Sequence, residues 1–278
     1  MSGFLHEVDY WLFGARRARS QPLYALVEGA EGAQALAADL ARAGRPGGVT
    51  RLDPSATLRD APYDFIACDL RPHAGHDLIL ADLAGLLAPG GGMRITVAAA
   101  SCDVPGLFGL LDRAGLQAAS LLPPLLYDPD AFQPDPGPYS CLPTVPDRMR
   151  AAMGESLAGD VPAHVVYARR TGDDIAWADP MDRAAVPFLR DGSGVELVRR
   201  IRLEDDRLPV TLGTRIVALK VPPQTRGLVP LLDGARTVAD LVAIMVSRGV
   251  PAERFDAIWR TMFATLSGLN QVLLQAPP

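Results

Sequence analysis

Cysteine is scarce and irregularly placed in this sequence. The chain holds 3 cysteines in 278 residues, namely Cys68, Cys102 and Cys141. Their odd number and wide spacing exclude a disulfide framework, and no pair forms the C-x-x-C half of a metal site. We therefore expect all three to be buried thiols.

The sequence also lacks a long apolar run and an excess of positive charge. No segment approaches the roughly 20 apolar residues that span a bilayer, and the first residues do not read as a secretory signal. These features favour a cytoplasmic protein that does not bind a membrane. With 27 Lys and Arg against 32 Asp and Glu, nucleic acid is not an expected partner. The basic cluster Arg16, Arg17 and Arg19 is interpreted either as a solvated turn or as an anion site.

Two motifs of common enzyme classes are missing as well. The sequence contains neither the G-x-x-x-x-G-K-[ST] phosphate loop nor the G-x-S-x-G turn of serine hydrolases, which argues against both chemistries. The composition is otherwise that of an ordered globular protein, with 49% hydrophobic and 21% charged residues, and the length suits two modest domains.

Strand and helix patterns alternate in the first part of the chain. The apolar run LYALV (residues 23–27) precedes EGAEG and a helical pattern with Leu36 and Leu40 on one face. Strands are predicted at 49–52 and 63–68, then a helix that ends before Pro89, a turn at the glycines 90–92, and a strand at 93–98. This alternation predicts an α/β, Rossmann-like domain with a mostly parallel sheet.

The pattern breaks in a proline-rich stretch at residues 116–161, which we interpret as a lid or insertion. The strand-like AHVVYARR (163–170) returns to the sheet, and TGDD follows as a linker. We therefore predict a first domain at 1–170 and a second at 171–278.

The second domain is predicted to be helical and winged-helix-like. Residues 211–221 suit a hairpin or short strand, and Thr237 with Asp240 forms a capping-box pattern that begins a helix. Apolar residues at helical spacing then continue from 255 to 273 in one longer helix. This spacing places Trp259, Phe263 and Leu266 in the core of the domain.

Six segments, in this order, resemble a known family. They are YWLFGARR (10–17), YDFIAC followed by His73 (63–73), LAPGGGM (87–93), LLYDPDAFQPDPG (125–137), ESLAGDVPAHVVY (155–167) and LVPLLDGARTVADL (228–241). Over nearly its whole length the chain resembles a bacterial family of class I, Rossmann-like methyltransferases that depend on S-adenosylmethionine (SAM) and carry a C-terminal methyltransferase regulatory domain.

The resemblance implies a SAM site that is degenerate here. It places Gly29 and Gly32 in the turn that holds the methionine part, Asp53 on the ribose, and Asp69 beside the cofactor. The family's turn has three glycines at alternate positions, whereas this chain has E-G-A-E-G, and residues 54–62 are too few for the helix and third strand that enclose adenine. Asp53, which precedes Pro54, is also typical of a turn.

The same resemblance implies that Tyr10, His73 and Tyr127 lie on the substrate side. His73, His76 and Asp77 also suggest a metal site, but spacing supplies no third ligand and a helix start explains Asp77, so we expect no metal.

Three functions are open at this point. The first is an active SAM-dependent methyltransferase. The second is a non-catalytic relative, or pseudoenzyme, that binds or regulates another protein in a homo- or heterodimer. The third is a peptide-binding module, because LLDGARTVADL also resembles small winged-helix peptide carriers. The methyl acceptor is not evident from the sequence.

Overall fold

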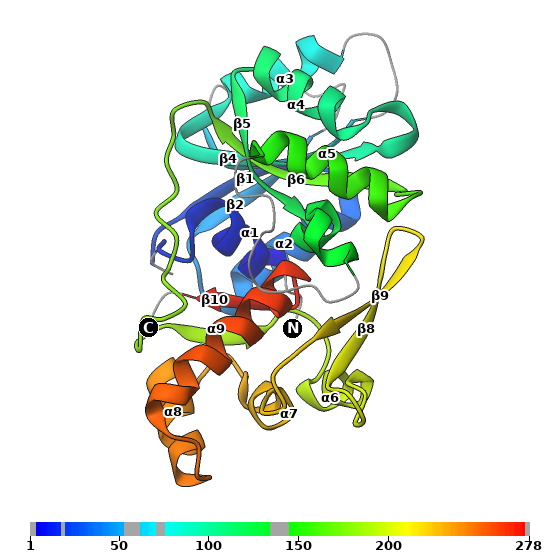
Figure 1. Ribbon diagram of the computed structural model, residues 1–278. Helices are drawn as coiled ribbons and strands as arrows, with labels where there is room; N and C mark the ends of the chain where they lie inside the picture. Colours follow the sequence, from blue (N-terminus) through cyan, green and yellow to red (C-terminus); the bar gives the residue numbers. More distant parts are fainter. Residues whose placement is uncertain (1–3, 18–19, 53–61, 71–75, 134–144, 276–278) are drawn as a thin grey trace. The chain divides into compact units, whose positions relative to one another are not determined.

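A computed structural model describes residues 4–17, 20–52, 62–70, 76–133 and 145–275 (Figure 1). The chain divides into two compact units. One comprises Met1–Leu122 with Pro162–Ala176, and the other comprises Pro123–Val161 with Trp177–Pro278. Among the described residues, no helix has both the length and the apolar character needed to cross a bilayer.

The first unit is built on a six-stranded sheet with the order β2-β1-β3-β4-β6-β5. β1 to β4 run parallel, and β6 runs antiparallel to both of its neighbours. The strands are β1 (Leu23–Glu28), β2 (Gly47–Leu52), β3 (Tyr63–Leu70), β4 (Leu87–Ala98), β5 (Leu116–Leu122) and β6 (Ala163–Arg170). The predicted Rossmann-like, mostly parallel sheet is therefore confirmed.

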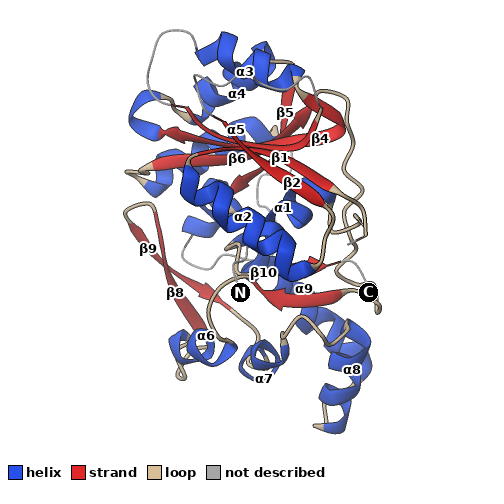
Figure 2. Ribbon diagram, turned by 180° about the vertical axis from the view of Figure 1, so that it is seen from behind, coloured by secondary structure: helices blue, strands red, loops and turns tan. Residues whose placement is uncertain are grey.

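Helices cover both faces of this sheet, with α1 and α2 on one face and α3 and α4 on the other (Figures 1 and 2). Their bounds are α1 (Phe4–Phe13), α2 (Ala30–Ala43), α3 (His76–Gly85) and α4 (Val104–Arg113), with a short 3-10 turn, η1, at Ala99–Ser101. The central strands are apolar because both faces are covered: Leu26, Phe65 and Ile95 are fully buried. A buried hydrogen bond of 2.8 Å from the Tyr167 hydroxyl to Glu7 Oε1 fixes α1 on the sheet.

The predicted absence of a third strand concerns the edge of the sheet at β2. β1 pairs directly with β3 and with β2, and within the described ranges β2 has no second neighbour. Residues 53–61, between β2 and β3, lie outside the described part of the chain.

The glycines 90–92 lie within β4, which begins at Leu87 and thus earlier than we predicted. The chain still bends there, because the register with β3 shifts between Leu87, opposite Tyr63, and Gly92, opposite Phe65, and Gly90 has a positive φ of 71°. A Cβ on Gly91 would lie 2.9 Å from the Tyr63 carbonyl oxygen, and one on Gly92 would lie 2.6 Å from Leu12 Cδ2. These glycines are needed for close packing inside the sheet.

The proline-rich stretch also begins later than we predicted. Residues 116–122 are not part of an insertion but form β5, the edge strand beside β6. Cys68 is buried as expected, whereas Cys102, just before the α4 N-cap Asp103, is partly exposed; Cys141 lies outside the described residues.

The second unit is mainly helical. It contains η2 (Pro124–Tyr127), η3 (Pro129–Phe132), α5 (Asp147–Ala158), β7 (Val186–Leu189), α6 (Gly194–Arg200), β8 (Arg207–Leu212), β9 (Arg215–Lys220), α7 (Thr225–Leu228), η4 (Val229–Leu231), α8 (Val238–Ser247), α9 (Ala252–Gly268) and β10 (Val272–Gln275). β8 and β9 form the expected hairpin. α8 packs against α9, and the capping box of Thr237 and Asp240 is present at its start.

The predicted core of α9 is confirmed. Trp259 and Leu266 are fully buried and Phe263 is 6% exposed. The helix nevertheless ends earlier than its apolar spacing suggested: Asn270 adopts a positive φ of 56°, and Leu273 belongs to β10, which pairs with β7. The apolar side chain of Leu273 is therefore buried as part of a strand and not as part of a longer helix.

Residues 123–161 belong to the second unit because they are bonded to its later elements. The Ala158 carbonyl oxygen, at the end of α5, accepts the Thr214 N–H at 3.0 Å. At the other end of the stretch, Gly268 in α9 is so close to Leu125 that a Cβ there would lie 2.7 Å from Leu125 Cγ. Of the stretch that we interpreted as a lid or insertion, residues 123–161 thus interrupt the first unit in sequence and belong to the second.

Candidate functional site

The turn between β1 and α2 is a single residue. Gly29 has φ 83° and ψ 141°, and α2 starts at Ala30. No heavy atom lies within 4 Å of the position that a Gly29 Cβ would occupy, so the space beside it is open. Gly32 lies inside the first turn of α2 rather than in a loop, and a Cβ there would be 3.3 Å from Val27 Cγ1. The glycine-rich loop is therefore reduced to Gly29 and the first N–H groups of α2.

Two acidic residues link the carboxyl ends of the central strands. Glu28, the last residue of β1, accepts the backbone N–H of Asp69 at 2.8 Å through Oε2. This bond extends the pairing of β1 with β3 beyond its last backbone partners, Val27 and Ala67. Asp69 is exposed at this edge, so the structure brings Asp69 together with the Gly29 turn.

The electrostatics of this edge are negative. Burial, together with the nearby Glu28 and Asp69 carboxylates, raises the pKa of the Cys68 thiol to about 12, and Arg94 opposes this shift. The first turn of α2 adds another acidic residue, Glu31. A cation at the carboxyl edge is therefore stabilised by these side chains, whereas the free N–H groups of the first turn of α2 favour an anion beside Gly29.

Two of the predicted site residues, Asp53 and His73, lie outside the described residues. Leu52, which precedes Asp53 in the sequence, is the register partner of Glu28. Among the described residues, no group of three or more His, Cys, Asp or Glu side chains is arranged to hold a metal ion.

Tyr10 lies in the last part of α1 and is 7% exposed, with its ring 4.8 Å from that of Trp11. Its neighbour Asp9 forms an ion pair of 2.7 Å with Arg45, which stands two residues before the start of β2. This turn of α1 thus lies at the amino edge of the parallel strands. The structure does not bring Tyr10 together with Gly29 and Asp69.

Tyr127 lies in the second unit, in η2, and is 5% exposed. Burial raises the pKa of its hydroxyl, and the nearby Glu155 carboxylate adds to this shift. Its backbone lies directly against Gly154 of α5. The contact of Tyr127 with substrate stays a prediction.

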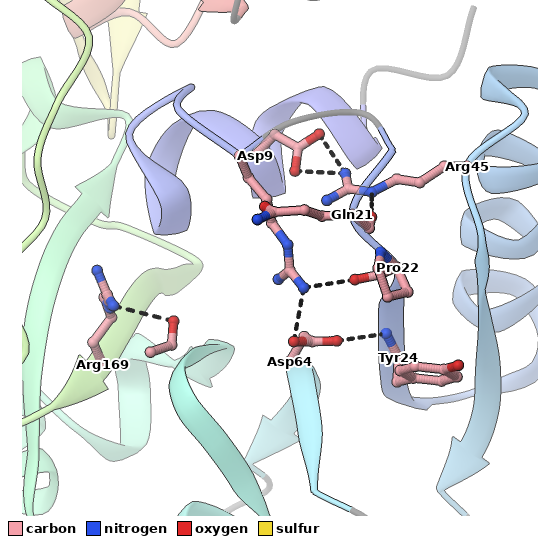
Figure 3. Close-up of polar contacts among 9 residues, drawn as sticks. Asp9, Gln21, Pro22, Tyr24, Arg45, Asp64 and Arg169 are labelled. Carbon is pink, nitrogen blue, oxygen red and sulfur yellow. Dashed lines mark hydrogen bonds and ion pairs between the residues drawn. The ribbon is translucent and has the colours of Figure 1, made fainter.

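A second site lies at the amino edge of the sheet (Figure 3). No cofactor motif of the sequence indicated it. It is a pocket of about 430 Å³ lined by Phe13, Arg17, Pro22, Asp64, Pro89 and Arg169, among others. Arg17 belongs to the basic cluster at 16–19, for which the sequence left a solvated turn and an anion site open. Its side chain is 15% exposed and forms an ion pair of 2.8 Å with Asp64, so Arg17 is not a solvated residue.

Comparisons with known proteins complete this description. No protein-family model and no curated protein sequence matches the chain. The structure of PKMT2 from Rickettsia typhi matches with a TM-score of 0.57 and 8% identity, over 99% of this chain and 75% of that chain. The structure of the same protein in complex with AdoHcy gives a TM-score of 0.51 at 8% identity, with the same coverage of 99% and 75%. The chain is thus similar in fold to PKMT2 over nearly its whole length.

Proposed function

We propose that this chain is a SAM-dependent methyltransferase that binds its cofactor at the carboxyl edge of β1 and β3. The observation that carries the proposal is the Gly29 turn, which opens directly into α2 at that edge, in a fold shared with a protein whose structure holds AdoHcy. Ligands of open α/β sheets bind at the carboxyl ends of the strands, where helix N-termini also point. The acceptor of the methyl group is left unassigned.

The chemistry of this edge suits the charges of SAM. The free N–H groups at the start of α2 are suited to the carboxylate of the methionine part. Glu28 and Asp69 supply negative charge near the same turn, which suits the sulfonium and the amino group. We assign the ribose hydroxyls to Asp53, since a carboxylate offers two oxygen acceptors. SAM supplies an activated methyl group, so the residues of the chain need chiefly to bind and align the two reactants.

A second candidate function is favoured by the reduced turn. A single residue between β1 and α2 presents fewer backbone N–H groups than a longer glycine-rich loop, and in the described residues β2 forms the edge of the sheet. Both features weaken cofactor binding. The second candidate is a non-catalytic relative that retains the scaffold and acts through a protein or peptide partner in a homo- or heterodimer.

Calorimetric titration of the whole chain with SAM and with AdoHcy tests the proposal. We expect both to bind. If neither gives heat at millimolar concentration, the chain is not an independent SAM-dependent enzyme, and the non-catalytic function is favoured.

The two glycines of the turn are expected to respond differently to alanine. Gly29 has a backbone conformation that alanine rarely adopts, so Gly29→Ala strains the turn by roughly 1–3 kcal/mol and should weaken SAM binding about tenfold. Gly32 is helical, and its new methyl group needs only a small shift of the Val27 side chain, so Gly32→Ala should change SAM affinity little. Calorimetry on both variants measures this difference. Equal losses in both would show that Gly29 has no special role.

Asp53→Asn should also weaken SAM binding if the ribose site is assigned correctly. Loss of a charge-assisted hydrogen bond costs on the order of 1.5–3 kcal/mol, which corresponds to about tenfold to a hundredfold in affinity. Asp160→Asn, a change of the same kind in the second unit, is the control and should leave SAM affinity unchanged. An Asp53→Asn variant that binds as tightly as wild type would place the ribose elsewhere.

A further inference from the structure

The pocket at the amino edge is separate from the proposed cofactor site. Pro22 and Asp64 stand at the starts of β1 and β3, whereas Gly29 and Asp69 stand at the ends of the same two strands. All of these residues belong to the first unit. The pocket volume of about 430 Å³ falls within the range of small-molecule sites, roughly 300–1,000 Å³.

Arg17 is held rigidly at this pocket but keeps unused donors. Its Nη2 donates to Asp64 Oδ1 at 2.8 Å and to the Pro22 carbonyl oxygen at 2.6 Å, and its guanidinium lies 4.6 Å from the centre of the Phe13 ring. A guanidinium has five N–H donors. The N–H groups on Nε and Nη1 have no hydrogen-bond acceptor in the described part of the chain.

The carboxylate of Asp64 is already committed. Oδ1 accepts from Arg17, and Oδ2 accepts the backbone N–H of Tyr24 at 2.8 Å (Figure 3). Asp64 therefore orients Arg17 from one side and leaves the other side of the guanidinium for a further anion. Fixing the cation in advance removes the entropy cost of ordering its side chain upon binding.

A second guanidinium lines the same pocket. Arg169 donates through Nη1 to the Asp174 carbonyl oxygen and through Nη2 to that of Gly90, each at 3.1 Å. Its side chain is 11% exposed, and its Nε is buried without a hydrogen-bond partner among the described residues. A buried, unpaired N–H is unfavourable, and the positive charge of Arg169, which lines the pocket, attracts an anion there.

The charges around the pocket decide which anion fits. Two guanidiniums, of Arg17 and Arg169, are balanced by the carboxylates of Asp64 and of Asp173, which lies 4.0 Å from Arg169. Because these four side chains together carry no net charge, the pocket accommodates a monoanion more readily than a dianion such as phosphate. Phe13, Pro22 and Pro89 supply apolar contact for the remainder of the ligand.

We propose that this pocket is a binding site for a small monocarboxylate with an apolar body, held by Arg17 and Arg169 at the opposite edge of the sheet from the proposed cofactor site. This proposal does not depend on whether the chain binds SAM.

Benzoate is the probe, and benzamide is its neutral control of the same shape. We expect a ligand-observed NMR titration of the whole chain to show benzoate binding with a Kd on the order of 1 mM, at least tenfold tighter than benzamide and unaffected by saturating AdoHcy. No saturable binding of benzoate, or equal binding of benzamide, overturns the proposal. Competition with AdoHcy would instead place benzoate at the carboxyl edge, and would likewise overturn it.

Two variants that act in opposite directions locate the site. Arg17→Met should weaken benzoate binding about tenfold or more. Asp173→Asn removes the competing charge beside Arg169 and leaves the contacts of Arg17 in place, so it should tighten benzoate binding several-fold while leaving benzamide unchanged. Arg183→Met is the matched control, because Arg183 also pairs with an aspartate, Asp256 at 2.6 Å, and lies over a ring, that of Phe255. If the Arg17→Met chain does not fold, the Asp173→Asn result decides, and unchanged or weaker benzoate binding there refutes the proposed site.

Discussion

Replacing Trp259 with alanine is expected to lower the free energy of unfolding of the second unit by about 3–5 kcal/mol. The indole is fully buried. It lies between the rings of Phe255, 6.2 Å away, and Phe263, 5.6 Å away. Its Nε1 donates to the Pro180 carbonyl oxygen at 2.6 Å. Alanine leaves a cavity between the two rings and removes the donor to that carbonyl group.

Urea unfolding followed by far-UV circular dichroism measures this loss without depending on tryptophan fluorescence. Trp177→Ala is the control, because Trp177 belongs to the same unit and is 37% exposed. Trp177→Ala should lower the free energy of unfolding by about 1 kcal/mol or less. Equal losses for the two variants would contradict the assignment of Trp259 to the core.

The elements that were predictable from the sequence are those whose signal is local. LYALV is a continuous apolar run, and β1 is a strand in which every residue of that run except Tyr24 is buried. The α8 helix follows from its capping box, in which Thr237 and Asp240 satisfy each other's backbone N–H groups. Trp259 and Phe263 recur at helical spacing because one face of α9 is buried.

The errors arose where distant parts of the chain meet. Leu273 continues the spacing of α9, yet it is paired in β10 with β7, more than eighty residues earlier. The glycines at 90–92 were predicted as a turn that precedes the strand, because no local pattern shows that β4 begins before them or that Leu12 and the Tyr63 carbonyl oxygen fill the space beside Gly92 and Gly91. Periodicity describes which face is buried, but it does not identify the segment that buries it.

The same distinction applies to the two sites. The resemblance to methyltransferases placed Gly29 and Asp69 at the site, both after apolar strands, and parallel strands bring such ends to one edge of a sheet. The amino-edge pocket gave no comparable signal, because Arg17, Asp64 and Arg169 are far apart in sequence and share no motif. Only the basic cluster at 16–19 hinted at an anion site, and its partner Asp64 comes from the start of β3.

Gly154→Ala is expected to destabilise the second unit by about 2 kcal/mol or more, although alanine is the better helix former by about 1 kcal/mol. A Cβ at residue 154 would lie 2.3 Å from the Tyr127 carbonyl carbon and 2.6 Å from its Cα. These are backbone atoms, so no side-chain rotation relieves the overlap, and α5 must move away from η2. The movement would also strain the ion pairs of Arg150 with Asp128 and Asp130, which join the same helix to η3.

Gly85→Ala is the control for this prediction. Gly85 is also helical, at the end of α3, but it is exposed and a Cβ there would have no heavy atom within 4 Å. The helix propensity of alanine should therefore act alone at this position and leave the stability unchanged or raise it by up to about 1 kcal/mol. Urea unfolding measures the change in the free energy of unfolding for both glycine variants. Changes of opposite sign indicate that the contact between α5 and η2 is as close as the structure shows. A stabilising effect at both positions would mean that η2 packs less tightly on α5, and it would free Tyr127 for the contact with substrate that the sequence suggested.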